Sequence, residues 1–218
     1  MSPTRKSPPL LLAAAVLSGV LALAGGYWLA DHLLVKSADL SKVHATVFRE
    51  PRIIEPFTLV DHTGKRFNNE SLQGRWSFVF FGYTHCPDVC PTTLSVLNSV
   101  AHMLEHEKDP VQFVFVSIDP ERDTPEQLGR FVSYFNGSFI GATGSEDTIK
   151  ALTRQLGVVY ARVATDSESQ NATTDNYLID HSASVLLFDP AGRFHAIFTP
   201  PLDAKSIADD FDLISKAY

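Results

Sequence analysis

The sequence is poor in cysteine and in positive charge. Cys86 and Cys90 are the only cysteines among 218 residues, whereas a small scaffold held together by disulfides needs several of them to staple its loops. A pair four positions apart hardly cross-links a fold, so this spacing indicates chemistry. Lys and Arg number 18 against 25 Asp and Glu, and the formal net charge of −7 argues against nucleic acid as a partner. The chain also shows no internal repeats.

Charge is missing altogether from residues 10–30, where Leu, Ala, Val and Gly dominate. An apolar run of about 20 residues can cross a bilayer as a helix that satisfies its own backbone hydrogen bonds. Arg5 and Lys6 precede the run and Asp31 follows it. This asymmetry predicts a single transmembrane anchor, with residues 1–9 in the cytoplasm and the chain after the anchor outside.

A cleavable signal peptide is the alternative interpretation of the same run. Ala22-Leu23-Ala24 has the small-x-small form of a cleavage site, although the apolar run continues past it to Ala30. Both interpretations export the folded part, and the short basic start is typical of bacteria. We therefore expect a single-pass protein of the inner (cytoplasmic) membrane with its soluble domain in the periplasm.

Residues 31–52 are polar and are predicted to form a linker, and residues 53–218 are predicted to form one α/β domain. The domain should open with a β-hairpin at residues 57–67, and further strands and helices follow from the apolar patterns. The expected strands are residues 77–83, 111–118, 139–142, 158–163, 184–188 and 193–198. The expected helices are one after Pro91, one capped by Thr124 and Gln127, and two at 146–156 and 203–216, with an exposed loop at 164–176.

The segment 83–91 contains both cysteines and falls between the first buried strand and its helix. In three-layer α/β folds, ligands gather at the C-terminal ends of parallel strands. If this segment is the first helical turn, Cys86 and Cys90 face the same way, and their sulfurs can hold one ion or join in a disulfide. A helix N-terminus also lowers the pKa of a thiol and favours the reactive thiolate. The alternative is a structural disulfide or two inert thiols, but so short a loop would stabilise the fold little.

Three motifs follow one another along the chain: FGYTHCPDVCP, VSIDPERDTPEQL and YLIDHSASVLLFDPAGR. Together they resemble the Sco/SenC family over residues 55–205, which is nearly the whole soluble part. The resemblance implies a thioredoxin-like fold, here with an added N-terminal hairpin, and similar in plan to peroxiredoxins and thiol oxidoreductases. It also implies copper as the cofactor and a role in building the dinuclear copper site of cytochrome c oxidase. The copper ligands that it implies are Cys86, Cys90 and His181.

The donor types agree with that ligand set. Two thiolates and an imidazole suit Cu(I) and can also hold Cu(II). Zinc accepts the same donors but usually takes a fourth ligand, and the sequence offers no further cysteine. In a thioredoxin-like sheet the loop before the late hairpin faces the cysteine-bearing helix, which would bring His181 within reach. Asp180 either orients the imidazole or is a solvated loop acid.

Other histidines and acids show weaker patterns. His85 adjoins Cys86 and is either an auxiliary ligand or turned elsewhere. His102 and His106 have i,i+4 spacing that can bind a metal, but the glutamates beside them indicate a solvated helix face. Surface positions are expected for four histidines, His32, His44, His62 and His195. The charged residues of the second motif should shape the loop beside the site without a catalytic role: Asp119, Glu121, Arg122 and Asp123.

Three functions remain open. A copper metallochaperone would pass the ion to the copper-site subunit of cytochrome c oxidase, and another periplasmic copper chaperone is a second candidate partner. A thiol–disulfide reductase would use Cys86 and Cys90 as a redox pair that keeps the copper-site cysteines of the oxidase reduced. A peroxidase or redox sensor would need an arginine to support its thiolate, and no clear one accompanies Thr84. Oxidoreductases of this fold usually have two residues between the cysteines and a cis-proline facing them. Here there are three residues and His181 instead, which favours metal binding.

Overall fold

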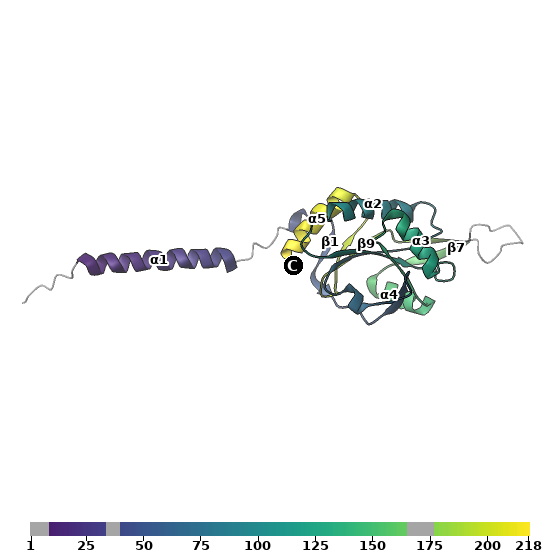
Figure 1. The fold of residues 1–218 in the computed structure, drawn as a ribbon, viewed down its shortest axis with the longest axis horizontal. Helices are drawn as coiled ribbons and strands as arrows, with labels where there is room; N and C mark the ends of the chain where they lie inside the picture. The colour runs from purple at the N-terminus through teal and green to yellow at the C-terminus, as the bar shows by residue number, and fades with distance from the viewer. Residues whose placement is uncertain (1–8, 34–39, 165–176) are drawn as a thin grey trace, which may run out of the picture. The chain divides into compact units, whose positions relative to one another are not determined.

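The computed structural model describes residues 9–33, 40–164 and 177–218. These residues fall into two units: a single helix, α1 (Pro9–Leu33), and a folded domain that begins at Leu40 (Figure 1). α1 includes the whole uncharged run. Within the described part of the chain, no helix is both long enough and apolar enough to cross a membrane. The transmembrane anchor therefore stays a prediction from the sequence.

An eight-stranded sheet forms the centre of the domain, with its strands in the order β1-β10-β9-β4-β5-β6-β2-β3. β5 runs parallel to its neighbours β4 and β6, and the other neighbouring strands are antiparallel. A second, two-stranded sheet consists of β7 and β8. The strands are β1 Thr46–Arg52, β2 Thr58–Asp61, β3 Arg66–Asn68, β4 Trp76–Gly82, β5 Val111–Ser117, β6 Ile140–Thr143, β7 Tyr160–Ala164, β8 Tyr177–His181, β9 Val185–Phe188 and β10 Phe194–Phe198.

Helices cover both faces of the large sheet, with α2, α3 and α5 on one side and α4 on the other (Figure 1). The helices are α2 Val89–Met103, α3 Pro125–Phe135, α4 Glu146–Leu156 and α5 Ala204–Ala217, with short 3₁₀ turns at Leu40–Lys42 and Asn69–Leu72. α3 begins with the predicted capping box, because Thr124 and Gln127 each accept a backbone hydrogen bond from the other. This arrangement confirms the predicted α/β class.

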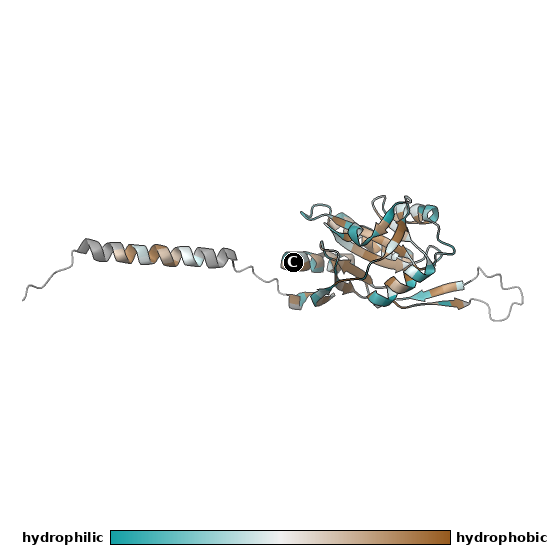
Figure 2. Cartoon of the chain, turned by 90° about the horizontal axis from the view of Figure 1, so that it is seen from below, coloured by the Kyte–Doolittle hydropathy of each residue, from teal (hydrophilic) through white to brown (hydrophobic). Residues whose placement is uncertain are grey.

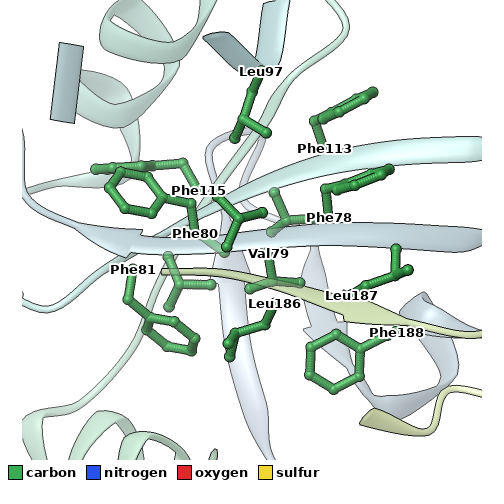
Figure 3. Packing of buried hydrophobic residues seen from close by; sticks show 14 of the residues in the cluster. Phe78, Val79, Phe80, Phe81, Leu97, Phe113, Phe115, Leu186, Leu187 and Phe188 are labelled. Atoms are coloured by element: carbon green, nitrogen blue, oxygen red, sulfur yellow. The ribbon is translucent and has the colours of Figure 1, made fainter. Parts of the chain in front are cut away.

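The core is rich in aromatic side chains and lies on both faces of the central strand β4 (Figure 3). Phe78 stacks on Phe113 with ring centroids 5.0 Å apart and also meets Phe211 of α5 at 5.4 Å. Phe81 points to the opposite face of the sheet. All residues of β4 are buried, which explains why its sequence is a continuous apolar run. Each fully buried Phe stabilises the fold by about 1.5–3 kcal/mol, and Figure 2 shows hydrophobic residues concentrated on these central strands.

Two strands of the structure are not predicted by the sequence pattern. β1 lies within the expected linker 31–52 and pairs with β10, so the domain begins before residue 53. As an edge strand it is only partly buried, and its polar residues hide the alternation that marks a strand. β8 includes His181, which the sequence places in a loop. The expected loop 164–176 lies outside the described residues, apart from Ala164 at the end of β7.

Candidate metal centre

The two cysteines flank the start of α2. β4 ends at Gly82 and α2 begins at Val89, so Cys90 lies in the first helical turn while Cys86 precedes the helix. Cys86 is therefore outside the turn where spacing alone would place it. Its Sγ nevertheless accepts a hydrogen bond from the backbone N–H of Cys90 at 3.3 Å, one of the donors that a helix start leaves unpaired. Asp88 at the N-cap position makes no side-chain capping bond, so the Cys86 sulfur supplies the acceptor here.

The burial of the two thiols is unequal. Cys90 is fully buried, whereas Cys86 is only partly buried, and both are free thiols. The Cys90 sulfur packs over Gly82: a Cβ there would lie 2.7 Å from this sulfur and 2.8 Å from Phe115 Cε2. Only glycine leaves the room that the sulfur occupies. One sulfur of the pair is therefore enclosed by the core, while the other can be reached from solvent.

His181 completes the group from far along the chain. It is the last residue of β8, and its Nε2 lies 3.3 Å from Cys90 Sγ. One ligand atom from each of Cys86, Cys90 and His181 lies within 4.8 Å of the others. Across residues 9–33, 40–164 and 177–218 this is the one such group of three or more potential metal ligands. The structure thus brings together the three residues that the sequence predicts as ligands.

The other nitrogen of His181 sets the orientation of its ring. Nδ1 lies 3.2 Å from the backbone carbonyl oxygen of Ser182, which can only accept a hydrogen bond. Nδ1 therefore carries the proton, and Nε2 keeps a lone pair for a metal. The ring packs against Phe80 and Tyr83, with centroids 5.8 and 6.1 Å away. Asp180 is exposed and the orienting acceptor is Ser182, so Asp180 fits the alternative of a solvated acid.

The short connection between β8 and β9 faces the cysteines without a proline. Residues 182–184 contain none, and His181 precedes them. A cis peptide bond joins Pro200 and Pro201 after β10, and Pro200 lines a hollow together with Val89 and Ala183. The side chain that reaches Cys90 from this connection is the imidazole of His181, as the sequence predicts.

The pKa values of the two thiols are shifted in opposite directions. The pKa of Cys86 falls to about 4, chiefly because the Cys90 thiol donates a hydrogen bond to it, and the backbone N–H groups of Cys90 and Asp88 add to the effect. The pKa of Cys90 is raised, because its proton is held in that hydrogen bond and because the sulfur is buried. The reduced pair is thus a Cys86 thiolate beside a Cys90 thiol. A metal that binds both sulfurs must displace one proton, from Cys90.

A buried polar network supports the loop that carries Cys86. Asp123 is fully buried and accepts hydrogen bonds from the Thr84 N–H (3.0 Å), the Thr84 hydroxyl (2.6 Å) and the Ser117 hydroxyl (2.6 Å). His85 Nδ1 lies 3.1 Å from Thr84 Oγ1 and 3.7 Å from Asp123 Oδ1, so its ring turns toward this network. Asp123 shapes the loop, as its place in the second motif predicts. His85 lies outside the group of metal ligands.

The sequence predicts the position of His102 correctly and that of His195 wrongly. His102 bonds Glu105 at 2.7 Å on the exposed face of α2, as predicted. The prediction that His195 lies on the surface is wrong. The residue is buried in β10, and its Nδ1 lies 3.4 Å from the buried Asp189 carboxylate. Desolvation lowers its pKa. The signal that could have found it is its position in an apolar strand that is buried on both faces.

The other histidines have structural or surface positions. His44 is exposed, although its Nδ1 lies 3.3 Å from the buried Asp210. His62 is half-buried and accepts a hydrogen bond from the Gly141 N–H at 3.1 Å, which the sequence gives no sign of. The side chain of His32 lies outside the described part of the structure.

Residues 46–215 match the family model of SCO1/SenC. The chain belongs to this family. SCO2-like protein RP587 of Rickettsia prowazekii (strain Madrid E) is 40% identical over 156 residues, which cover 72% of this chain and 74% of that protein. The crystal structure of Arabidopsis thaliana ScoI with copper bound is similar at a TM-score of 0.69 and 34% identity, over 75% of this chain and 98% of that one.

A more distant structure has the same fold. BsSco, described as a member of the Sco family of cytochrome c oxidase assembly proteins with a disulfide switch, is similar at a TM-score of 0.57. It is 23% identical, over 78% of this SCO1/SenC chain and 97% of BsSco. The family assignment from the three motifs and the mixed α/β, thioredoxin-like fold are both confirmed.

Proposed function

We propose that this SCO1/SenC protein binds copper through Cys86, Cys90 and His181 and delivers it to the dinuclear copper site of cytochrome c oxidase. The observation that carries the proposal is the convergence of two sulfurs and one imidazole nitrogen within 4.8 Å. Such donors suit Cu(I) and can also hold Cu(II), whereas structural zinc usually takes four ligands. The similar ScoI of Arabidopsis thaliana, which has copper bound, supports copper as the metal.

Each ligand has its own part in capturing the ion. Cys86 offers a thiolate at the partly exposed edge of the site without first losing a proton. Cys90 gives up its proton as the ion binds, so binding releases a proton to solvent. His181 presents Nε2 because the Ser182 carbonyl holds the proton on Nδ1.

The proposed acceptor is the copper-site subunit of cytochrome c oxidase, and the proposed donor is another periplasmic copper chaperone. The description of the Sco family as cytochrome c oxidase assembly proteins supports this acceptor. We place residues 10–30 in the inner membrane and the domain in the periplasm, because the run is uncharged and follows two basic residues. Release of the full chain from membranes by alkaline carbonate would contradict this placement.

A thiol–disulfide reductase is the second candidate, and the Cys86 thiolate favours it. This thiolate would attack the oxidised cysteine pair of the oxidase subunit, forming a mixed disulfide and expelling one thiolate of that pair. Cys90, after losing its proton, would then attack Cys86 Sγ and expel the second thiolate. The subunit pair is reduced by two electrons, and the two cysteines of this chain become a disulfide.

Anaerobic Cu(I) titration of the reduced full-length protein in detergent distinguishes the two candidates. We expect one equivalent bound and, after oxidation, thiolate-to-copper charge-transfer bands and an EPR signal with sulfur and nitrogen donors. Cys86→Ser and Cys90→Ser should each abolish tight binding, and His181→Ala should weaken it, because the first two remove a thiolate and the third leaves both.

Stoichiometric copper in the double Cys86→Ser, Cys90→Ser variant would put the site elsewhere and overturn the proposal. Absence of specific copper binding, together with a readily exchanging Cys86–Cys90 disulfide, would favour the reductase.

A further inference from the structure

The hairpin of β7 and β8 carries His181 but does not belong to the eight-stranded sheet. Its strands pair with each other, with Tyr160 opposite His181 and Ala164 opposite Tyr177. No backbone ladder therefore fixes this hairpin against β4 or β5, the strands beneath the cysteine loop. Residues 182–184 tie the His181 end of β8 to β9 of the large sheet, and the rest of the hairpin is held by side-chain contacts with neighbouring loops.

Asp119, which lies two residues after β5, makes the central contact with this hairpin. It is fully buried, and each carboxylate oxygen accepts one hydrogen bond at 2.5 Å, Oδ1 from the Tyr177 hydroxyl and Oδ2 from Arg122 Nε. Arg122 also donates from Nη1 to the Tyr177 carbonyl oxygen at 3.1 Å, and its guanidinium lies 3.7 Å from the Tyr177 ring centroid. The first residue of β8 is thus held at its hydroxyl, its ring and its carbonyl group.

The same loop holds the cysteine side of the site. Asp123 accepts both hydrogen bonds of Thr84, which is two residues from Cys86. The Ser117 hydroxyl joins the two acids, because it accepts from the Asp119 N–H at 3.0 Å and donates to Asp123 at 2.6 Å. The loop 119–123 is therefore connected to the histidine side through Asp119 and to the cysteine side through Asp123.

We infer that Asp119, Arg122 and Tyr177 are positioning residues for His181, and that the loop 119–123 sets the separation between the imidazole and the two sulfurs. The inference rests on the proposed ligand set. A buried carboxylate–guanidinium pair adds little net stability over apolar packing, so its contribution here is the fixed direction of its charge-assisted hydrogen bonds. Tyr83 adds a further contact, since its hydroxyl accepts the N–H of Ile179 at 3.1 Å.

Tyr177→Phe in the full-length protein tests the inference, because it removes one hydroxyl and keeps the ring against Arg122. We expect the Cu(I) affinity, measured by competition with a chromophoric chelator, to fall by up to about 10-fold, the low end of the loss when a direct partner of a metal ligand is removed, because Tyr177 acts on His181 only through β8. The nitrogen coupling in the Cu(II) EPR signal should also weaken, while the alkylation rate of Cys86 stays unchanged. Tyr134→Phe is the matched control: it removes the hydroxyl of a tyrosine on α3 that is 86% exposed, and it should leave the affinity within about 2-fold.

A double-mutant cycle separates positioning from general destabilisation. In a His181→Ala background, Tyr177→Phe should cause no further loss, because the residue on which it acts is gone. An equal loss in both backgrounds, or wild-type affinity in Tyr177→Phe, overturns the inference. If Tyr177→Phe fails to fold, Arg122→Lys takes its place, since lysine keeps the charge and loses the planar fork. A wild-type chain that binds no copper refutes the proposed function instead, which is a distinct result.

Discussion

The reactivity of Cys86 toward alkylation should be almost independent of pH between pH 6 and pH 8. With a pKa of about 4, this thiol is about 99% thiolate at pH 6, whereas a thiol at the usual value of 9.0 is about 0.1% thiolate. The gain of about 1,000-fold in thiolate is partly offset, because nucleophilicity falls by about 2–2.5 powers of ten over five pKa units. Cys86 should therefore react roughly 3–10 times faster than an ordinary thiol at pH 6.

The assay is iodoacetamide labelling of the reduced, metal-free protein, with mass spectrometry to identify the labelled cysteine. Glutathione serves as the ordinary thiol, whose rate should rise by about tenfold per pH unit over this range. Cys90→Ala removes the hydrogen bond that lowers the pKa of Cys86 most, so its rate profile should recover a slope at the acidic end. A tenfold rise per pH unit for Cys86 in the wild-type protein would refute the reasoning.

Two more predictions concern stability. Between pH 4 and pH 9 the folded state binds fewer protons at Cys86 than the unfolded state, so this part of the unfolding free energy grows with pH and is lost as pH falls through about 4. Thermal melting at pH 5 and pH 8 should show a smaller increase in Tm for reduced Cys86→Ser than for wild type, and equal increases would contradict this. Gly82→Ala should destabilise the fold by about 1–3 kcal/mol in urea unfolding and weaken copper binding, because its Cβ would meet Cys90 Sγ and Phe115 within 2.8 Å. Gly137→Ala, where a Cβ meets nothing within 4 Å, is the control, and equal losses in both variants would count against the packing argument.

Continuous apolar runs made the central strands readable from the sequence. β4 and β5 are buried along almost their whole length, so neither needs an alternating pattern to be recognised. The sequence pattern did not predict β1 and β8, because each strand is partly exposed and is held in place by partners far along the chain. β1 is fixed by β10, and β8 by β7 and by the loop after β5.

In the candidate site, too, the local features could be predicted from the sequence, whereas the contacts between distant residues could not. The closeness of Cys86 and Cys90 follows from their spacing, although the cap that Cys86 provides to α2 does not. His181 is 91 positions from Cys90, and no local pattern joins them, so its place as a ligand came from the resemblance to a family. The contact between Asp119 and Tyr177 spans 58 positions and depends on a buried carboxylate that the sequence shows only as one more charged loop residue.

The unequal burial of the two sulfurs gives the proposed handover an order. Cys86 and His181 are both partly exposed, whereas the core closes over Cys90. In the proposed handover, an acceptor would therefore reach the ion from the side of Cys86 and His181, and Cys90 would be the last ligand to let go. The ion would then keep protein ligands throughout and would not be released as a free aquo ion.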